Sequence, residues 1–159
     1  MPRRTGRTVS PLDAADRAIL AALVEDGRLP VAEVARRANI SRANAYTRIE
    51  RLTASGCITG YGARLDSKRL GLEVGALVFL RVEQAEWRRL RQQILDVAEV
   101  EFVGLTSGEF DFVVLVRATN TDMLRDVVLA RLLAMDGVRG TQTLLLFDDT
   151  VRGPWVPPA

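Results

Sequence analysis

The feature that most constrains the fold is a pair of short helical segments separated by only a tight turn. Pro30 suits the first turn of a helix, where its missing N–H costs nothing, and apolar residues recur at helical spacing as far as Ala38. Asn39 tolerates a left-handed backbone, and Ser41 can cap a following helix that runs to about Ser55. So short a connection forces the two helices to cross steeply, which is typical of a helix-turn-helix.

Another helix precedes this pair. Asp13, followed three residues later by Asp16, predicts a capped helix start, and apolar residues then recur on one face between residues 19 and 24. Gly27 ends this helix. The helix that follows Ser41 is mostly polar in its first turns, so its outer face is free to contact a partner.

Charge is distributed unevenly along the chain. Residues 1–69 hold 13 Lys+Arg and 7 Asp+Glu, whereas residues 70–159 hold 9 and 13. This asymmetry suggests that the N-terminal half meets a polyanion, although a solvated basic face would give the same pattern. In residues 1–11, Arg3, Arg4 and Arg7 indicate a flexible basic arm.

The helix after Ser41 is the expected DNA-reading element. In a helix-turn-helix its first turns reach base edges in the major groove, where Arg pairs with guanine and Asn with adenine. Tyr46 could equally pack against the first helix. We predict that double-stranded DNA is bound by Arg42, Asn44, Ala45, Tyr46, Thr47, Arg48 and Arg51.

A different pattern begins at residue 73. We expect strands over 74–82, 100–106, 110–117 and 138–147, and helices over 85–97 and 122–135. The order β-α-β-β-α-β predicts a ferredoxin-like antiparallel sheet with both helices on one face. The fold class is therefore α+β, with an N-terminal three-helix helix-turn-helix (winged-helix-like) domain and a C-terminal ferredoxin-like βαββαβ domain. The expected boundaries are 1–11 for the arm, 12–59 for the DNA-binding domain, 60–72 for a linker, 73–149 for the second domain and 150–159 for a tail.

The predicted sheet has a second apolar face. The apolar runs around Phe79 and Phe112 are nearly continuous, whereas a sheet covered on one side only should alternate strictly. We expect the second face to pack on another subunit and form a homodimer, unless these short runs simply tolerate exposure.

Composition excludes several classes of function. The chain has no histidine and one cysteine, Cys57, which excludes Ser-His and Cys-His nucleophiles, histidine-ligated zinc and an internal disulfide. No apolar run reaches the roughly 18 residues that span a bilayer, and the basic start leads into acidic residues rather than an apolar signal core. We expect a cytoplasmic protein without membrane contact, catalytic residues, metal or cofactor. A small ferredoxin-like metabolic enzyme and an architectural DNA-binding protein without effector remain as alternatives.

Several short motifs resemble one family. They are Leu12-Asp13-Ala14-Ala15-Asp16, Ile40-Ser41 before Arg48-Ile49 and Leu52, Gly56-Cys57-Ile58-Thr59-Gly60-Tyr61, Gly108-Glu109-Phe110-Asp111, and Gly137-Val138-Arg139-Gly140-Thr141-Gln142-Thr143. In this order and spacing the chain resembles the Lrp/AsnC, or feast/famine, transcriptional regulators over about residues 12–149. The resemblance implies a homodimer, often assembled further, that binds promoter DNA and responds to an amino acid or similar metabolite.

The resemblance also implies an effector site between dimers. By matching the family's Gly-x-x-Asp hairpin and the paired threonines of its last strand, the candidate residues are Thr106, Ser107, Gly108, Asp111, Thr141 and Thr143. A carboxylate can accept hydrogen bonds from an α-ammonium group, and exposed amides and hydroxyls can hold a carboxylate. Gly108 could instead serve only the turn, and the threonines could be ordinary strand residues.

Overall fold

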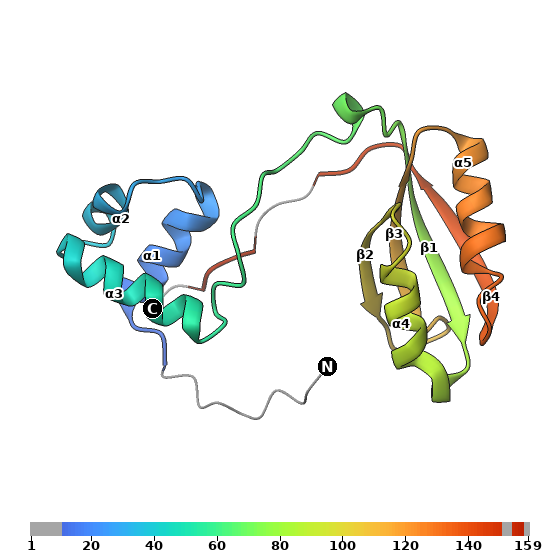
Figure 1. Cartoon of the computed structure of the whole chain (residues 1–159), viewed down its shortest axis with the longest axis horizontal. Helices are drawn as coiled ribbons and strands as arrows, with labels where there is room; N and C mark the ends of the chain where they lie inside the picture. The colour runs from blue at the N-terminus through green and yellow to red at the C-terminus, as the bar shows by residue number, and fades with distance from the viewer. Residues whose placement is uncertain (1–10, 151–153, 158–159) are drawn as a thin grey trace. The chain divides into compact units, whose positions relative to one another are not determined.

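The computed structural model describes residues 11–150 and 154–157, which form two compact units (Figure 1). One unit holds the described residues up to Arg64 together with 154–157, and the other holds Leu65–Thr150. The basic arm predicted over 1–11 lies outside the described residues except for Pro11.

The first unit consists of three helices, α1 (Ala14–Glu25), α2 (Val31–Arg37) and α3 (Arg42–Ala54). Asp13 and Asp16 form a reciprocal capping box, and the Ser41 hydroxyl accepts a hydrogen bond from the Asn44 amide at 3.2 Å. Asn39 adopts a φ of 53° in the turn between α2 and α3. The helices and their caps are therefore as predicted, and a small core of Ile19, Val34, Ala38 and Leu52 holds them together.

The second unit is a four-stranded antiparallel sheet with helices. Its strands are β1 (Val74–Val82), β2 (Val100–Leu105), β3 (Phe112–Ala118) and β4 (Val138–Leu146), in the spatial order β2-β3-β1-β4. A 3₁₀ turn (Lys68–Leu70) precedes β1, and another (Gln84–Glu86) leads into α4 (Trp87–Leu95). α5 (Thr121–Asp126) joins β3 to β4. This is the predicted ferredoxin-like arrangement.

The last helix differs from a regular α-helix. Asn120 caps α5 by accepting a hydrogen bond from the Met123 amide at 2.8 Å. From Val127 to Leu132 the helix has π-helical hydrogen bonding, so that the Leu133 amide donates to the Val128 carbonyl at 2.8 Å. Apolar periodicity does not distinguish this wider turn from an α-helix.

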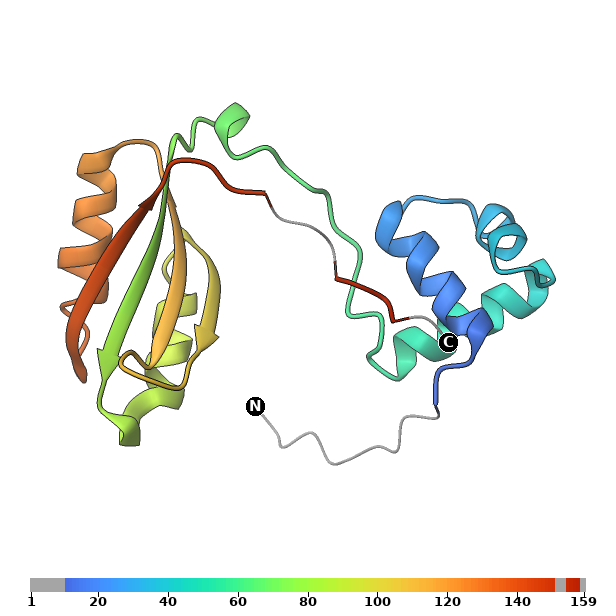
Figure 2. The same ribbon diagram turned by 180° about the vertical axis from the view of Figure 1, so that it is seen from behind.

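The two faces of the sheet differ in burial. Side chains such as Val78, Leu80, Val114 and Val116 are buried against α4 and α5. The opposite face lies toward the viewer in Figure 2, where the strands lie in front of α4. We call this surface the open sheet face; by strand register it carries Leu77, Phe79, Phe102, Val113, Leu115, Leu144 and Leu146.

Candidate nucleic-acid interface

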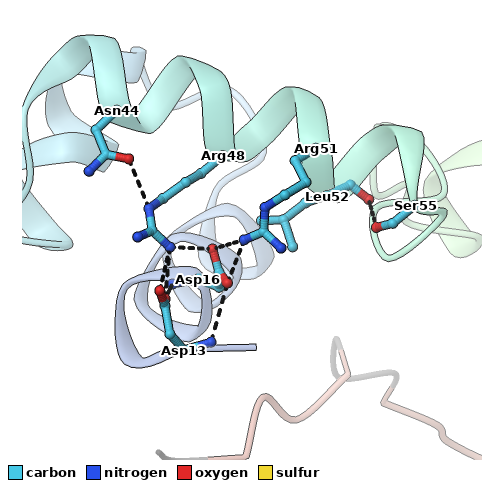
Figure 3. A network of polar contacts seen from close by, with 7 residues as sticks. All are labelled: Asp13, Asp16, Asn44, Arg48, Arg51, Leu52 and Ser55. Atoms are coloured by element: carbon cyan, nitrogen blue, oxygen red, sulfur yellow. Dashed lines mark hydrogen bonds and ion pairs between the residues drawn. The ribbon is translucent and has the colours of Figure 1, made fainter. Parts of the chain in front are cut away.

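An ion-pair network fixes α3 against α1 (Figure 3). Asp16, with a side chain only 1% exposed, accepts hydrogen bonds from Arg51 Nη2 at 2.6 Å and from Arg48 Nη1 at 2.8 Å. Arg48 Nη1 also donates to Asp13 at 2.7 Å, and Arg48 Nε donates to the side-chain carbonyl of Asn44 at 2.9 Å. The network sets the angle at which α3 is presented by the unit.

The acidic members of this network are held in their charged form. Burial alone would raise the pKa of Asp16, but hydrogen bonds from Arg51, Arg48 and the Asp13 amide outweigh it and lower the pKa. The pKa of Asp13 is lowered by the hydrogen bond from the Asp16 amide and then by Arg48. Both carboxylates therefore act as anchors for the arginines of α3 near neutral pH.

Burial and the ion-pair network change the interpretation of three predicted DNA-binding residues. Ala45 is fully buried against the core, so its prediction as a DNA contact is wrong. Arg48 and Arg51 carry side chains 23% and 41% exposed, and each directs a guanidinium nitrogen at Asp16. This geometry indicates that Arg48 and Arg51 mainly hold α3 in position. A contact with a DNA phosphate would have to use guanidinium nitrogens that do not bind Asp13 or Asp16.

The other predicted residues lie on the exposed side of α3. Arg42 lies over the Tyr46 ring, with its guanidinium carbon 5.6 Å from the ring centroid. Tyr46 is 46% exposed and is not part of the apolar core that the three helices share. Asn44 and Thr47 are also exposed. Asn44 uses its side-chain oxygen to bind Arg48, so its side-chain nitrogen remains available to donate hydrogen bonds. α3 thus presents a cation, an aromatic ring and an amide near its N-terminus.

The predicted effector residues fall into two groups. Thr106, Ser107, Gly108 and Asp111 belong to the connection between β2 and β3. The Asp111 carboxylate accepts a hydrogen bond from the Val82 amide at 2.8 Å, and the Thr106 hydroxyl donates to the Phe110 carbonyl at 2.5 Å. Gly108 has a φ of +136°, a conformation that favours glycine. Asp111 and Gly108 therefore have a structural role in this connection, independent of any ligand.

Thr141 and Thr143 lie on β4, on the other side of β1. They pair with Leu80 and Val78, so by register they project toward the helix-covered face of the sheet. The hairpin residue Asp111 contacts β1 at Leu80 and Val82. The two groups thus lie at the same end of the sheet with a strand between them, and one chain does not bring their side chains together.

The sequence prediction includes Thr47 but not Ala43 and Glu50, which share its outward stripe on α3. Ala43 and Glu50 are exposed on either side of Thr47 in the helical repeat, whereas Ala45 and Leu52 are buried. A helical wheel centred on Ala45 and Leu52 would have identified this stripe, because residues 43, 47 and 50 lie opposite that seam.

Two further features are absent from the part of the chain that the structure describes. No group of three or more Cys, Asp or Glu side chains there is arranged to hold a metal ion. No helix among residues 11–150 and 154–157 is long and apolar enough to cross a membrane.

Comparison with known proteins identifies both units. Residues 12–53 match the AsnC-type helix-turn-helix domain, and residues 75–156 match the Lrp/AsnC ligand binding domain. The chain belongs to the Lrp/AsnC family. Its members are helix-turn-helix transcriptional regulators, so this Lrp/AsnC chain is a DNA-binding regulator with an effector-responsive second domain.

Individual relatives of this Lrp/AsnC chain are also transcriptional regulators. An uncharacterized HTH-type transcriptional regulator of Pyrococcus abyssi is 31% identical over 85% of each chain. The proline dehydrogenase transcriptional activator of Rhodobacter capsulatus is 32% identical, covering 89% of this chain and 94% of that protein. The feast or famine regulatory protein of M. tuberculosis, complexed with L-methionine, is 28% identical with a TM-score of 0.84, covering 92% of this chain and 100% of that one.

Proposed function

We propose that this regulator reads promoter DNA through the exposed N-terminal turns of α3. Arg42, Asn44, Tyr46 and Thr47 carry the base contacts, while Arg48 and Arg51 position the helix. The observation that carries the proposal is the Asp16 network, because it holds α3 with its polar face outward. The basic arm adds contacts to phosphates, which are independent of sequence.

Arg42 offers the most direct test of this assignment. Arg42→Ala is expected to weaken specific binding by about 1 to 3 kcal/mol and to relax base preference at one position, if the arginine pairs with guanine. Gel shifts with a selected operator and with random DNA measure both effects. Arg91→Ala removes the same charge from the exposed surface of α4 and should leave base preference unchanged. Equal losses on both kinds of DNA would instead make Arg42 a phosphate contact.

We propose further that the working form is a homodimer joined through the open sheet face, with higher assembly built on it. Phe102 and Leu144 are 52% and 47% exposed on this face, and the half-buried Leu77, Phe79 and Leu115 lie between them. A contiguous apolar surface of this kind favours association. A two-fold pair would place two copies of α3 on successive turns of DNA, so we expect operators that are imperfect palindromes.

The effector we propose is an amino acid or a similar small metabolite. Support comes from the M. tuberculosis relative complexed with L-methionine. Asp111 and Thr141 lie on either side of β1 within one chain, and we propose that the effector site takes these two groups from different copies. Ligand binding would then bias assembly, and with it DNA binding, by its differential affinity for the assembled states.

Asp111 provides a test of the effector site. Asp111→Asn keeps the size of the side chain and an oxygen that can accept from the Val82 amide, but it removes the charge that would bind an α-ammonium group. We expect at least tenfold weaker amino-acid binding by calorimetry, with DNA affinity in the absence of ligand unchanged. Asp126→Asn, on the exposed side of α5, is the matched control. Unchanged ligand affinity in Asp111→Asn would place the site elsewhere.

The same measurements separate the remaining alternatives. An architectural DNA-binding protein would show no change in DNA binding with any amino acid, and it would show little preference among sequences. A DNA-binding regulator acts where the DNA is, so the cytoplasm is the location that we propose.

A further inference from the structure

Glu50 stands apart from the other acidic residues of the DNA-binding unit. Residues 11–64 contain six Asp and Glu, and five of them have partners among the described residues. Asp13 and Asp16 bind Arg48, Glu25 and Glu33 bind Arg37, and Asp26 accepts a hydrogen bond from the Arg28 amide. Glu50 is exposed and, within the described residues, forms neither an ion pair nor a hydrogen bond.

Glu50 also lies on the surface of α3 that faces away from the core. It follows Thr47 by three residues and Ala43 by seven, so the three share one stripe opposite the buried Ala45 and Leu52. The Thr47 hydroxyl donates to the Ala43 carbonyl at 3.2 Å. Thr47 and Ala43 therefore present methyl groups on the outward surface of the helix. The stripe is about 10 Å long at 1.5 Å per residue, close to the rise of three base pairs.

A free carboxylate is unfavourable on a helix that approaches a polyanion. Near phosphates it is repelled, whereas most basic side chains of a DNA-binding surface are attracted. In the major groove, however, the cytosine N4 amino group is a hydrogen-bond donor, and Glu and Asp are the side chains that accept from it. Methyl groups such as those of Ala43 and Thr47 suit contact with the thymine methyl. A carboxylate at the end of this stripe is therefore suited to base edges and not to the DNA backbone.

We propose that Glu50 is a specificity residue whose carboxylate accepts a hydrogen bond from the N4 amino group of a cytosine in each half-site. This inference rests on the proposed function, because it requires that α3 enter the major groove. It adds Glu50 to the residues that contact bases. The negative charge of Glu50 would also disfavour bases that place a hydrogen-bond acceptor at the position of the cytosine amino group.

The test uses the full-length protein and a pool of duplexes with randomised half-sites. The parent should select cytosine at one position of each half-site, with roughly tenfold discrimination against the other bases. Glu50→Ala should reduce that discrimination to less than about twofold, at that position only. Glu50→Gln should shift the preference at the same position toward adenine, because an amide can pair with adenine N6 and N7. Glu25→Gln makes the same charge change on α1 and should alter affinity for all sequences alike.

The outcomes separate this inference from the proposed function. Unchanged thermal unfolding of the Glu50 variants establishes that they fold, as expected for an exposed side chain without partners. If the parent selects a sequence but the Glu50 variants select the same one, the inference is overturned and the proposed function stands. A uniform gain in affinity for all DNA, with preference unchanged, also overturns it, because Glu50 would then only repel phosphates. A parent without any preferred sequence overturns the proposed function and this inference together.

Discussion

Replacing Asp16 with alanine is expected to lower the free energy of unfolding of the DNA-binding unit by about 2 kcal/mol. Removing one partner of a fully buried ion pair costs about 3 to 5 kcal/mol, because the other charge is left without compensation. Here Arg48 and Arg51 have side chains 23% and 41% exposed, so water can solvate them in part and the loss is smaller. Urea unfolding followed by the helical circular dichroism signal measures the change.

The matched control for Asp16 is another acid that binds two arginines. Glu33 accepts hydrogen bonds from Arg36 and Arg37 at the surface of α2, so Glu33→Ala should change stability little. Asp16→Ala should in addition weaken specific DNA binding, because α3 loses its fixed angle to α1. Equal stability losses in the two variants would show that the Asp16 pairs are worth no more than surface ones.

Acid provides a second measurement of the same network. Hydrogen bonds from Arg48 and Arg51 and from the capping-box amides lower the folded-state pKa values of Asp13 and Asp16 from their ordinary value of 3.8. A lowered folded pKa contributes stability above the unfolded-state value, and this contribution is lost as pH falls through the folded value. We expect the unit to lose stability as pH falls below about 4, with a weaker pH dependence in Asp16→Ala than in the parent.

If the proposed homodimer forms through the open sheet face, placing an arginine at Leu115 is expected to convert it into a monomer. Leu115 lies in the middle of the open sheet face, where it pairs with Leu77 on β1 and Phe102 on β2. A two-fold interface contains the substitution twice, and each copy loses about 1.5 to 3 kcal/mol of apolar burial before the cost of an unpaired charge is added. The dissociation constant should therefore rise at least a hundredfold. Light scattering across a concentration series measures the change.

Leu95 supplies the control for this substitution. It lies on α4 and is 41% exposed, so Leu95→Arg introduces the same side chain at another apolar surface position. This variant should remain a dimer. A dimeric Leu115→Arg with an unchanged dissociation constant would contradict the assignment of the open sheet face as the interface. An unchanged near-ultraviolet circular dichroism spectrum would establish that Leu115→Arg keeps its fold.

Local features of the sequence predicted most of the fold. Asp13 and Asp16 cap α1, Asn39 takes the left-handed turn and Ser41 caps α3, all as expected from residue type. Caps and turns depend on hydrogen bonds within three or four residues, so the local sequence specifies them. The alternation of apolar runs and helical periods likewise specified β-α-β-β-α-β, because each period matches one kind of element. The domain boundaries at 59 and 73 stay a prediction.

The direction of individual side chains was decided by contacts between distant residues. Arg48 and Arg51 were predicted to contact DNA, but they bind Asp16, which lies 32 and 35 residues earlier. Ala45 was assigned to the DNA surface although it packs in the core, and the exposed Glu50 was overlooked. Composition shows that a helix is polar and basic, but the face it turns outward is set by how it packs against α1. Only the tertiary structure brings the buried carboxylate of Asp16 beneath α3, and that contact determines which side chains remain available to DNA.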